Sequence, residues 1–290
     1  MVGPTLERQD YTLVLPDGRS LGWAQYGADE GRPLLYFHGG VSSRLDIEFA
    51  SDYCRDNNIK IIAPDRPGTG ISSPQPKRNL LNWAEDVENL LNHLNIESLP
   101  LLGWSLGGPY VWVCAYKLPN RFNKTSTIGG ASPIVPPVQI EQLGLLVDRM
   151  LFTCPPAFEP MLAASLDASG KLPPQTLRWI LENELADDDK AIVQALTLSQ
   201  ATDFIIEATR QGGMGVVDDY RACAQPWGFE VSQIKGDVTL WYGEQDRLLP
   251  RTMTDYLKRN MPQAQVNLVL DRGHFLLHKE LDKVLSHLFS

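Results

Sequence analysis

Residues 103–107 read Gly-Trp-Ser-Leu-Gly and follow directly on the short apolar run at 99–102. A buried strand that ends in Gly-x-Ser-x-Gly and turns at once into a helix holds its serine in a strained backbone conformation, with the hydroxyl exposed above the sheet. The flanking glycines let strand and helix approach closely, and the first free N–H groups of the helix point toward the serine. The apolar segment 109–116 that follows is typical of a helix buried against a sheet. Ser105 is therefore the candidate nucleophile.

Short apolar runs alternate with helical patterns along most of the chain, which indicates a parallel sheet with helices on both faces. The expected strands fall at 11–15, 21–26, 33–37, 59–63, 99–102, 124–129, 238–242 and 266–270. A Pro-Asp-Gly turn joins the first two strands into a hairpin. The expected helices fall near 45–55, 82–94, 109–116 and 276–288. These patterns predict an α/β fold.

The alternation stops at 133–137 and resumes near 238, and the residues between favour helix. This predicts a helical cap at 134–226, inserted into a core domain formed by residues 1–133 and 227–290. The cap holds 13 acidic and 6 basic residues, so it carries −7 of the net charge of −9. Asp187, Asp188 and Asp189 are interpreted as the N-cap and solvated first turn of a helix.

Composition narrows the class of protein. A chain of 290 residues that is 43% hydrophobic can form one domain with an insertion. The net charge of −9 disfavours nucleic acid as a partner, and no apolar run approaches the ~20 residues of a membrane span. The four cysteines lack Cys-x-x-Cys spacing and are expected to be buried thiols. Because no secretory pattern begins the sequence, a cytoplasmic location is expected. The oligomeric state, monomer or homodimer, is left open.

A serine hydroxyl needs a base at neutral pH, and the base needs an acid to orient it. His274 and Asp246 are the candidates, because each follows an expected strand at the edge where sites of open α/β sheets form. Glu244, two residues nearer its strand, is the alternative acid. The rival histidines fall within expected helices: His93, His278 and His287. The pair His274 and His278 lacks the Glu of the His-Glu-x-x-His metal motif, so no metal site is expected.

An acyl-transfer site also needs N–H donors for the oxyanion of its intermediate. The N–H of Leu106, next to the nucleophile, is the first candidate. The second comes from the Gly-Gly loop after the strand at 33–37, with Gly40 preferred and Val41 next. His38 in this loop is expected to be a structural hydrogen-bonding residue. The side chains expected to line an apolar substrate pocket are those of Val41, Trp104 and Phe275.

Five segments together resemble the α/β-hydrolase superfamily, in its cap-bearing branch of serine esterases and proline iminopeptidases: residues 37–40, 65–72, 103–107, 243–246 and 273–274. The resemblance implies an eight-stranded, mostly parallel sheet, hydrolysis through an acyl-enzyme without a cofactor, and a cap that shapes the pocket. It also implies a structural role for the glycines and Arg66 of 65–72. Resembling epoxide hydrolases and haloalkane dehalogenases use an aspartate where this chain has Ser105.

These features favour a serine hydrolase that cleaves a small-to-medium, largely apolar carboxylic ester, with a small molecule as its partner. An aminopeptidase similar to proline iminopeptidases is the alternative suggested by the acidic cap. Val41 and Ser42 depart from that pattern, which has Pro-Gly after the glycines. A hydrolase of C–C bonds and a ligand receptor on the same fold remain open, because both can retain the same residues.

Overall fold

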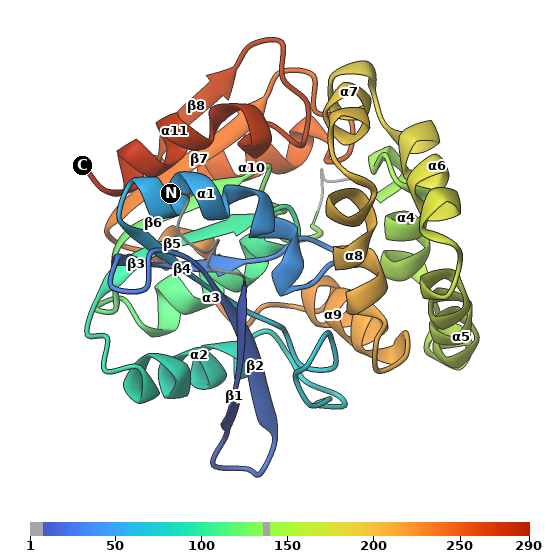
Figure 1. Ribbon diagram of the computed structural model, residues 1–290, viewed down its shortest axis with the longest axis horizontal. Helices are drawn as coiled ribbons and strands as arrows, with labels where there is room; N and C mark the ends of the chain where they lie inside the picture. The colour runs from blue at the N-terminus through green and yellow to red at the C-terminus, as the bar shows by residue number, and fades with distance from the viewer. Residues whose placement is uncertain (1–7, 136–139) are drawn as a thin grey trace, which may run out of the picture.

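Eight strands form one sheet in the order β1-β2-β4-β3-β5-β6-β7-β8 (Figure 1). This computed structural model describes residues 8–135 and 140–290. The strands are β1 (Gln9–Val14), β2 (Ser20–Gly27), β3 (Arg32–Phe37), β4 (Ile59–Pro64), β5 (Leu99–Trp104), β6 (Phe122–Ile128), β7 (Asp237–Gly243) and β8 (Gln265–Val269). Strand β2 pairs antiparallel with β1 and β4, and all other pairs are parallel. The predicted eight-stranded, mostly parallel sheet is confirmed.

The helices follow the strands in the expected alternation until β6, after which six α-helices come in succession before β7. The α-helices are α1 (Ser51–Asp56), α2 (Asn82–His93), α3 (Gly107–Lys117), α4 (Leu146–Thr153), α5 (Glu159–Gly170), α6 (Pro174–Glu184), α7 (Asp187–Ala195), α8 (Leu198–Ala208), α9 (Met214–Ala224), α10 (Arg251–Asn260) and α11 (Leu277–Leu288). The short 3-10 helices are η1 (Arg44–Ala50), η2 (Ile140–Gln142), η3 (Pro156–Phe158) and η4 (Val231–Gln233). None of the helices that the structure describes is long and apolar enough to cross a membrane.

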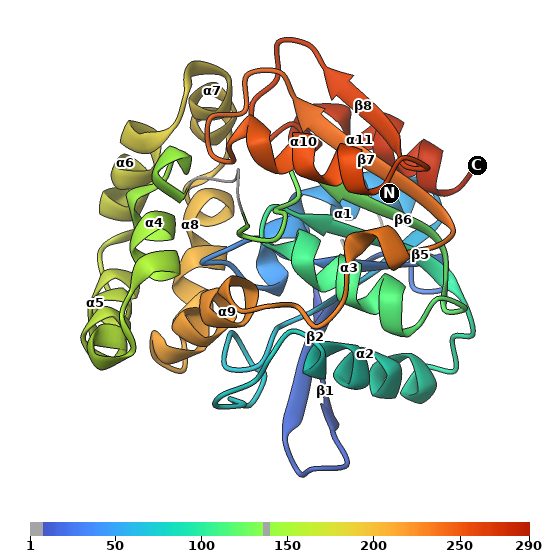
Figure 2. The same cartoon turned by 180° about the vertical axis from the view of Figure 1, so that it is seen from behind.

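Helices cover both faces of the sheet, and its central strands β3, β4 and β5 are apolar and buried on both sides. In β3, Leu35 and Phe37 join the cluster formed with α2, α3 and α10, whereas Leu34 and Tyr36 join the cluster formed with η1, α1 and α11. Figure 1 shows α1 and α11 in front of the sheet, and Figure 2 shows α2, α3 and α10 in front of it. Such two-sided burial is expected of parallel strands.

Helices α4 to α8 gather at one side of the sheet, beyond the end at which β5 leads into α3 (Figures 1 and 2). No strand occurs among the described residues of 134–226, as the sequence predicts. Residues 136 and 137, at the predicted start of the cap, lie outside the described residues. So do residues 1–7, on which the expectation about a secretory segment rests. The division into core and cap therefore stays a prediction.

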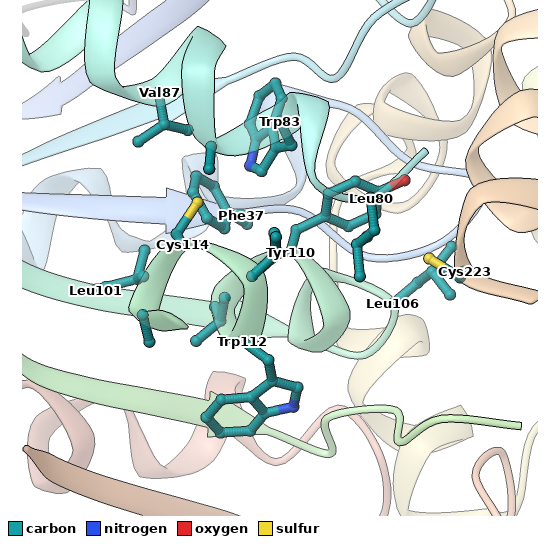
Figure 3. Packing of buried hydrophobic residues seen from close by; sticks show 14 of the residues in the cluster. Phe37, Leu80, Trp83, Val87, Leu101, Leu106, Tyr110, Trp112, Cys114 and Cys223 are labelled. Atoms are coloured by element: carbon teal, nitrogen blue, oxygen red, sulfur yellow. The ribbon is translucent and has the colours of Figure 1, made fainter. Parts of the chain in front are cut away.

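Three aromatic rings pack together beside α3 and connect this helix to the sheet (Figure 3). The ring of Trp83 meets Phe37 edge-on with centroids 5.3 Å apart, and Tyr110 edge-on at 6.0 Å. Trp83 lies on α2, Phe37 on β3 and Tyr110 on α3, so one side chain joins three elements. Edge-to-face pairs add to the energy of area burial.

Replacement of Trp83 by alanine is expected to lower the free energy of unfolding by about 3–5 kcal/mol, because it leaves a cavity at this junction. The control is Trp179→Ala on α6, whose side chain is 66% exposed and whose loss is expected to cost at most about 0.5 kcal/mol. Urea unfolding monitored by circular dichroism compares the two variants. Equal midpoints for both would contradict the packing role of Trp83.

Candidate active site

The turn between β5 and α3 places Ser105 in the left-handed region, with φ of +55°. This conformation is costly for a residue with a side chain and is held by backbone hydrogen bonds on both sides. The Ser105 N–H donates to the carbonyl of Ile128 at 2.9 Å, and the N–H of Ala131 donates to the carbonyl of Ser105 at 3.1 Å. Glycine is needed at 107, since a Cβ there would lie 2.4 Å from the carbonyl oxygen of Phe37.

The loop after β3 is oriented by a buried guanidinium. Arg66 donates to the carbonyl oxygens of His38 and Gly39, each at 2.6 Å. In a trans peptide the N–H points opposite to the carbonyl, so the N–H of Gly40 points away from Arg66. Within the described residues, neither the N–H of Gly40 nor that of Leu106 donates a hydrogen bond. Both N–H groups are thus free to bind a ligand.

Arg66 is itself held by Asp219 of α9, through an ion pair of 2.6 Å between two fully buried side chains. Burial would raise the pKa of Asp219, but the guanidinium groups of Arg66 and Arg78 hold it below its usual range. Nε2 of His38 accepts a long hydrogen bond of 3.4 Å from the backbone N–H of Arg66. Burial, together with Arg66, lowers the pKa of His38 well below 6.5, so this ring is neutral. Its contacts match the structural role expected for it.

His274 and Asp246 lie together, as their positions after β8 and β7 predict. The ring Nδ1 of His274 is 2.8 Å from Oδ2 of Asp246. The other carboxylate oxygen of Asp246 accepts from the N–H groups of Leu248 and Leu249, at 2.9 and 3.1 Å. These bonds fix the carboxylate behind the ring. Glu244, the alternative acid, instead lies 3.5 Å from the N–H of Asp271.

Beneath this pair lies Gly129, which the sequence analysis did not single out. A Cβ at this position would lie 2.9 Å from the ring of His274 and 3.2 Å from Oδ2 of Asp246, and its φ is +50°. Both the conformation and the space therefore require glycine. The sequence signal that could have found it is a glycine immediately after a buried strand of the sheet.

The electrostatics around His274 favour its protonated form. The imidazole is buried, which alone would lower its pKa, but the carboxylates of Asp246, Asp189 and Asp148 outweigh this and raise the pKa above 6.5. An anion near an imidazole stabilises the imidazolium. The ring of Trp104 lies 5.5 Å from that of His274, and its Nε1 donates to the His274 carbonyl at 3.1 Å. The indole of Trp104 thus covers one side of the His274 ring.

A cavity of about 210 Å³ lies against these residues. Six of the side chains and backbone groups singled out from the sequence line it: Gly40, Val41, Trp104, Ser105, His274 and Phe275. Most of the remaining lining is apolar and comes from α4, α5, α6 and α8. The cavity therefore lies between the sheet edge and the helices of 134–226.

Two carboxylates interrupt the apolar lining, and sequence reasoning identified neither. Asp148 accepts a hydrogen bond from the Tyr220 hydroxyl, and Glu184 lines the cavity near them. Burial raises the pKa of Asp148 to about 6, although Tyr220 and His274 oppose this. A Cβ at Gly40 would lie 2.1 Å from the Tyr220 hydroxyl, so the pair borders the Gly-Gly loop. No Lys or Arg among the described residues lines this cavity.

The interpretation of the three aspartates as an N-cap and a solvated turn is wrong for two of them. They do form the first turn of α7, but Ala186 is the N-cap. Asp189 is fully buried and accepts hydrogen bonds from the N–H groups of His274 and Phe275 at 3.0 and 2.8 Å. Asp188 accepts from the N–H of Gly273 at 2.9 Å, and only Asp187 is exposed.

The rival histidines lie elsewhere. His278 stacks on Phe49, with ring centroids 3.7 Å apart, and His287 is hydrogen-bonded to Thr239. His93 packs edge-on against Trp23. Within residues 8–135 and 140–290, no group of three or more His, Cys, Asp or Glu side chains is arranged to hold a metal ion.

Comparison with known proteins gives a match between residues 32–281 and the family described as alpha/beta hydrolase fold. Among curated proteins, the uncharacterized hydrolase YcgS of Bacillus subtilis (strain 168) is 36% identical over 118 residues, which is 41% of this chain and 40% of that protein. The chain matches its first curated relatives over 31% to 65% of their own length.

Solved structures are similar over nearly the whole chain. A thermophilic esterase from Thermogutta terrifontis has a TM-score of 0.69 at 19% identity, with 96% of both chains covered. The epoxide hydrolase VrEH1 from Vigna radiata has a TM-score of 0.74 at 17% identity, with 98% of this chain and 97% of that chain covered. At these identities the likeness concerns the fold alone.

Replacement of Asp219 by asparagine is expected to lower the free energy of unfolding by about 3–5 kcal/mol, because it leaves the buried Arg66 without its anion. Urea unfolding measures this loss. The control is Asp52→Asn, which removes an exposed ion pair with Arg55 and should leave the stability unchanged. An Asp219→Asn variant with the midpoint of the wild type would contradict the anchoring role of this pair.

Proposed function

The chain belongs to the α/β-hydrolase family, and we propose that it is a serine hydrolase of small-to-medium, largely apolar carboxylic esters. The observation that carries the proposal is the arrangement of three groups. Ser105, with φ of +55°, and His274 line one cavity, and the ring Nδ1 of His274 is 2.8 Å from Asp246. A serine activated by an oriented imidazole is suited to acyl transfer.

In the proposed mechanism, Oγ of Ser105 attacks the ester carbonyl carbon, and Nε2 of His274 takes the hydroxyl proton. Asp246 orients the ring and stabilises the imidazolium. The N–H groups of Leu106 and Gly40 bind the oxyanion of the tetrahedral intermediate. The intermediate collapses to an acyl-serine as His274 gives its proton to the leaving alcohol. A water molecule, deprotonated by His274, then hydrolyses the acyl-enzyme to the free acid.

The cavity supports a largely apolar substrate. Its lining includes Val41, Trp104 and Phe275, and further leucine, isoleucine and phenylalanine side chains of the cap helices. Burial of an acyl chain against such surface contributes about 25 cal/mol per Å². The two carboxylates and the absence of Lys and Arg from the described lining disfavour an anionic acyl group.

An aminopeptidase is the second candidate, and one feature favours it. Asp148 and Glu184 in the cavity could bind the ammonium group of an N-terminal residue. A proline iminopeptidase is also among the curated relatives, at 31% identity over 91 residues. The same three catalytic groups would serve for amide cleavage.

Hydrolysis of p-nitrophenyl esters from acetate to decanoate tests the proposal. Ser105→Ala should reduce kcat/KM by at least about 10³-fold, because the nucleophile is removed. Ser169→Ala is the matched control, since Ser169 lines the same cavity and hydrogen-bonds its own helix. Full activity in Ser105→Ala would exclude Ser105 as the nucleophile. Cleavage of a prolyl arylamide with no turnover of esters would favour the aminopeptidase instead.

The pH dependence of kcat/KM should report the pKa of His274. Because nearby carboxylates raise this pKa, the acidic limb should have its midpoint above 6.5. Activity is lost as the pH falls through this value, since the protonated imidazole cannot act as a base. Asp148→Asn separates the titration of Asp148, whose pKa is about 6, from that of His274. A midpoint below 6.5 in both proteins would contradict the assignment.

A further inference from the structure

The first turn of α7 lies directly on the loop that carries His274. Three consecutive N–H groups of this loop, those of Gly273, His274 and Phe275, donate to two carboxylates of the turn at 2.9, 3.0 and 2.8 Å. Asp188 accepts the first of these bonds and Asp189 the other two. The two segments are about 85 residues apart in the sequence. The predicted cap is thus bonded to the loop of the candidate base.

Asp189 is buried without a countercharge. Its side chain is 0% exposed, and no described Lys or Arg forms an ion pair with it. A buried carboxylate is costly unless hydrogen bonds satisfy it. Here the loop N–H groups and the N-terminal end of α7 do so. Burial nevertheless raises the pKa of this carboxyl.

Asp189 binds the backbone N–H of His274, and the other polar atoms of this residue also have partners, with one exception. The His274 carbonyl accepts from Nε1 of Trp104, and the ring Nδ1 is bonded to Asp246. With the N–H bonded to Asp189, every polar atom of His274 has a protein partner except Nε2. Nε2 is the atom that must face the serine. The three bonds hold the backbone and the ring of His274 in place. They thereby set the direction in which Nε2 points.

Apolar contacts support the same docking. Phe275 is buried in a cluster with Ile192 and Val193 of α7, and Trp104 packs against it with ring centroids 5.0 Å apart. Gly273 is needed beneath the turn, since a Cβ there would lie 2.3 Å from Oδ1 of Asp189. The loop and the helix turn therefore fit one another closely.

We propose that Asp189 is a positioning residue for the base, through which the first turn of α7 sets the place of His274 relative to Ser105. This inference rests on the proposed function, because it concerns the efficiency of that same base. The helices of 134–226 then contribute to the chemical step as well as to the walls of the cavity. Loss of the carboxylate should leave the substrate cavity intact and misplace Nε2.

Four substitutions separate this role from a general effect of charge or folding. Asp189→Asn removes the charge and places an NH₂ group against at least one N–H donor. Asp187→Asn removes an exposed charge from the same turn and is the matched control. Gly273→Ala keeps Asp189 but pushes its carboxylate away from the loop. Asp188→Asn keeps an acceptor oxygen for the N–H of Gly273 but removes the charge, which lies 4.0 Å from Arg272, and it serves as the mildest variant.

Ester hydrolysis and the titration of His274 by NMR are measured for each variant. Asp189→Asn and Gly273→Ala should lower kcat by the order of 10- to 100-fold with little change in KM, since a displacement of about 1 Å is enough. Asp188→Asn should give a smaller loss, and Asp187→Asn none. The pKa of His274 should fall in Asp189→Asn, while Asp246 and Asp148 still face the ring.

Thermal unfolding establishes which variants are folded at the assay temperature. Wild-type kcat and an unchanged His274 pKa in folded Asp189→Asn would overturn the proposal, as would an equal loss in Asp187→Asn. If Asp189→Asn does not fold, Gly273→Ala and Asp188→Asn decide the same question. The NMR titration does not need turnover. If the wild type is inactive, the proposed function fails. If the pKa of His274 nevertheless falls in Asp189→Asn, the contact between Asp189 and His274 is supported.

Discussion

The turn at Ser105 depends on two close contacts that leave no room for a side chain. A Cβ at Gly103 would lie 2.5 Å from Val111, and one at Gly107 would lie 2.4 Å from the carbonyl oxygen of Phe37. These contacts bring the start of α3 against both its own strand and the end of β3. A Cβ at Gly40 would lie 3.4 Å from the Cβ of Leu106, so the loop after β3 and the residue after Ser105 lie close together.

Charged side chains from distant segments bind carbonyl and N–H groups of the two loops near this turn. Arg66 binds two carbonyl groups of the loop after β3 and is neutralised by Asp219 of α9. Asp189 of α7 binds two N–H groups of the His274 loop. These bonds hold the backbone of the two loops that border the candidate site. In a largely apolar cavity such preorganisation is worth more than it would be in water.

The candidate catalytic groups could be selected from the sequence because each follows a recognisable strand. Ser105, Asp246 and His274 come after apolar runs, and the ends of parallel strands meet at one edge. The eight strands themselves were predictable from periodicity, with ends displaced by one or two residues. For instance, β8 spans Gln265–Val269 where 266–270 was expected.

The contacts that support the site were not predictable, because they join segments far apart in the sequence. Asp189 lies in a run of three aspartates whose local pattern is that of a solvated helix start, and its partners are 85 or more residues away. Tyr220 and Asp148 are 72 residues apart on different helices. No local periodicity signals that a carboxylate will face a backbone loop or a cavity. Such pairings follow from how the helices of 134–226 pack against one another and against the sheet.

Covalent labelling tests whether Ser105 is a nucleophile that His274 activates. The protein is treated with a fluorophosphonate, which phosphonylates an activated serine, and the site is mapped by mass spectrometry of its peptides. We expect one adduct, on Ser105, and little labelling of Ser105 in His274→Ala. An adduct on a different residue, or equal labelling of Ser105 in the two proteins, would contradict it.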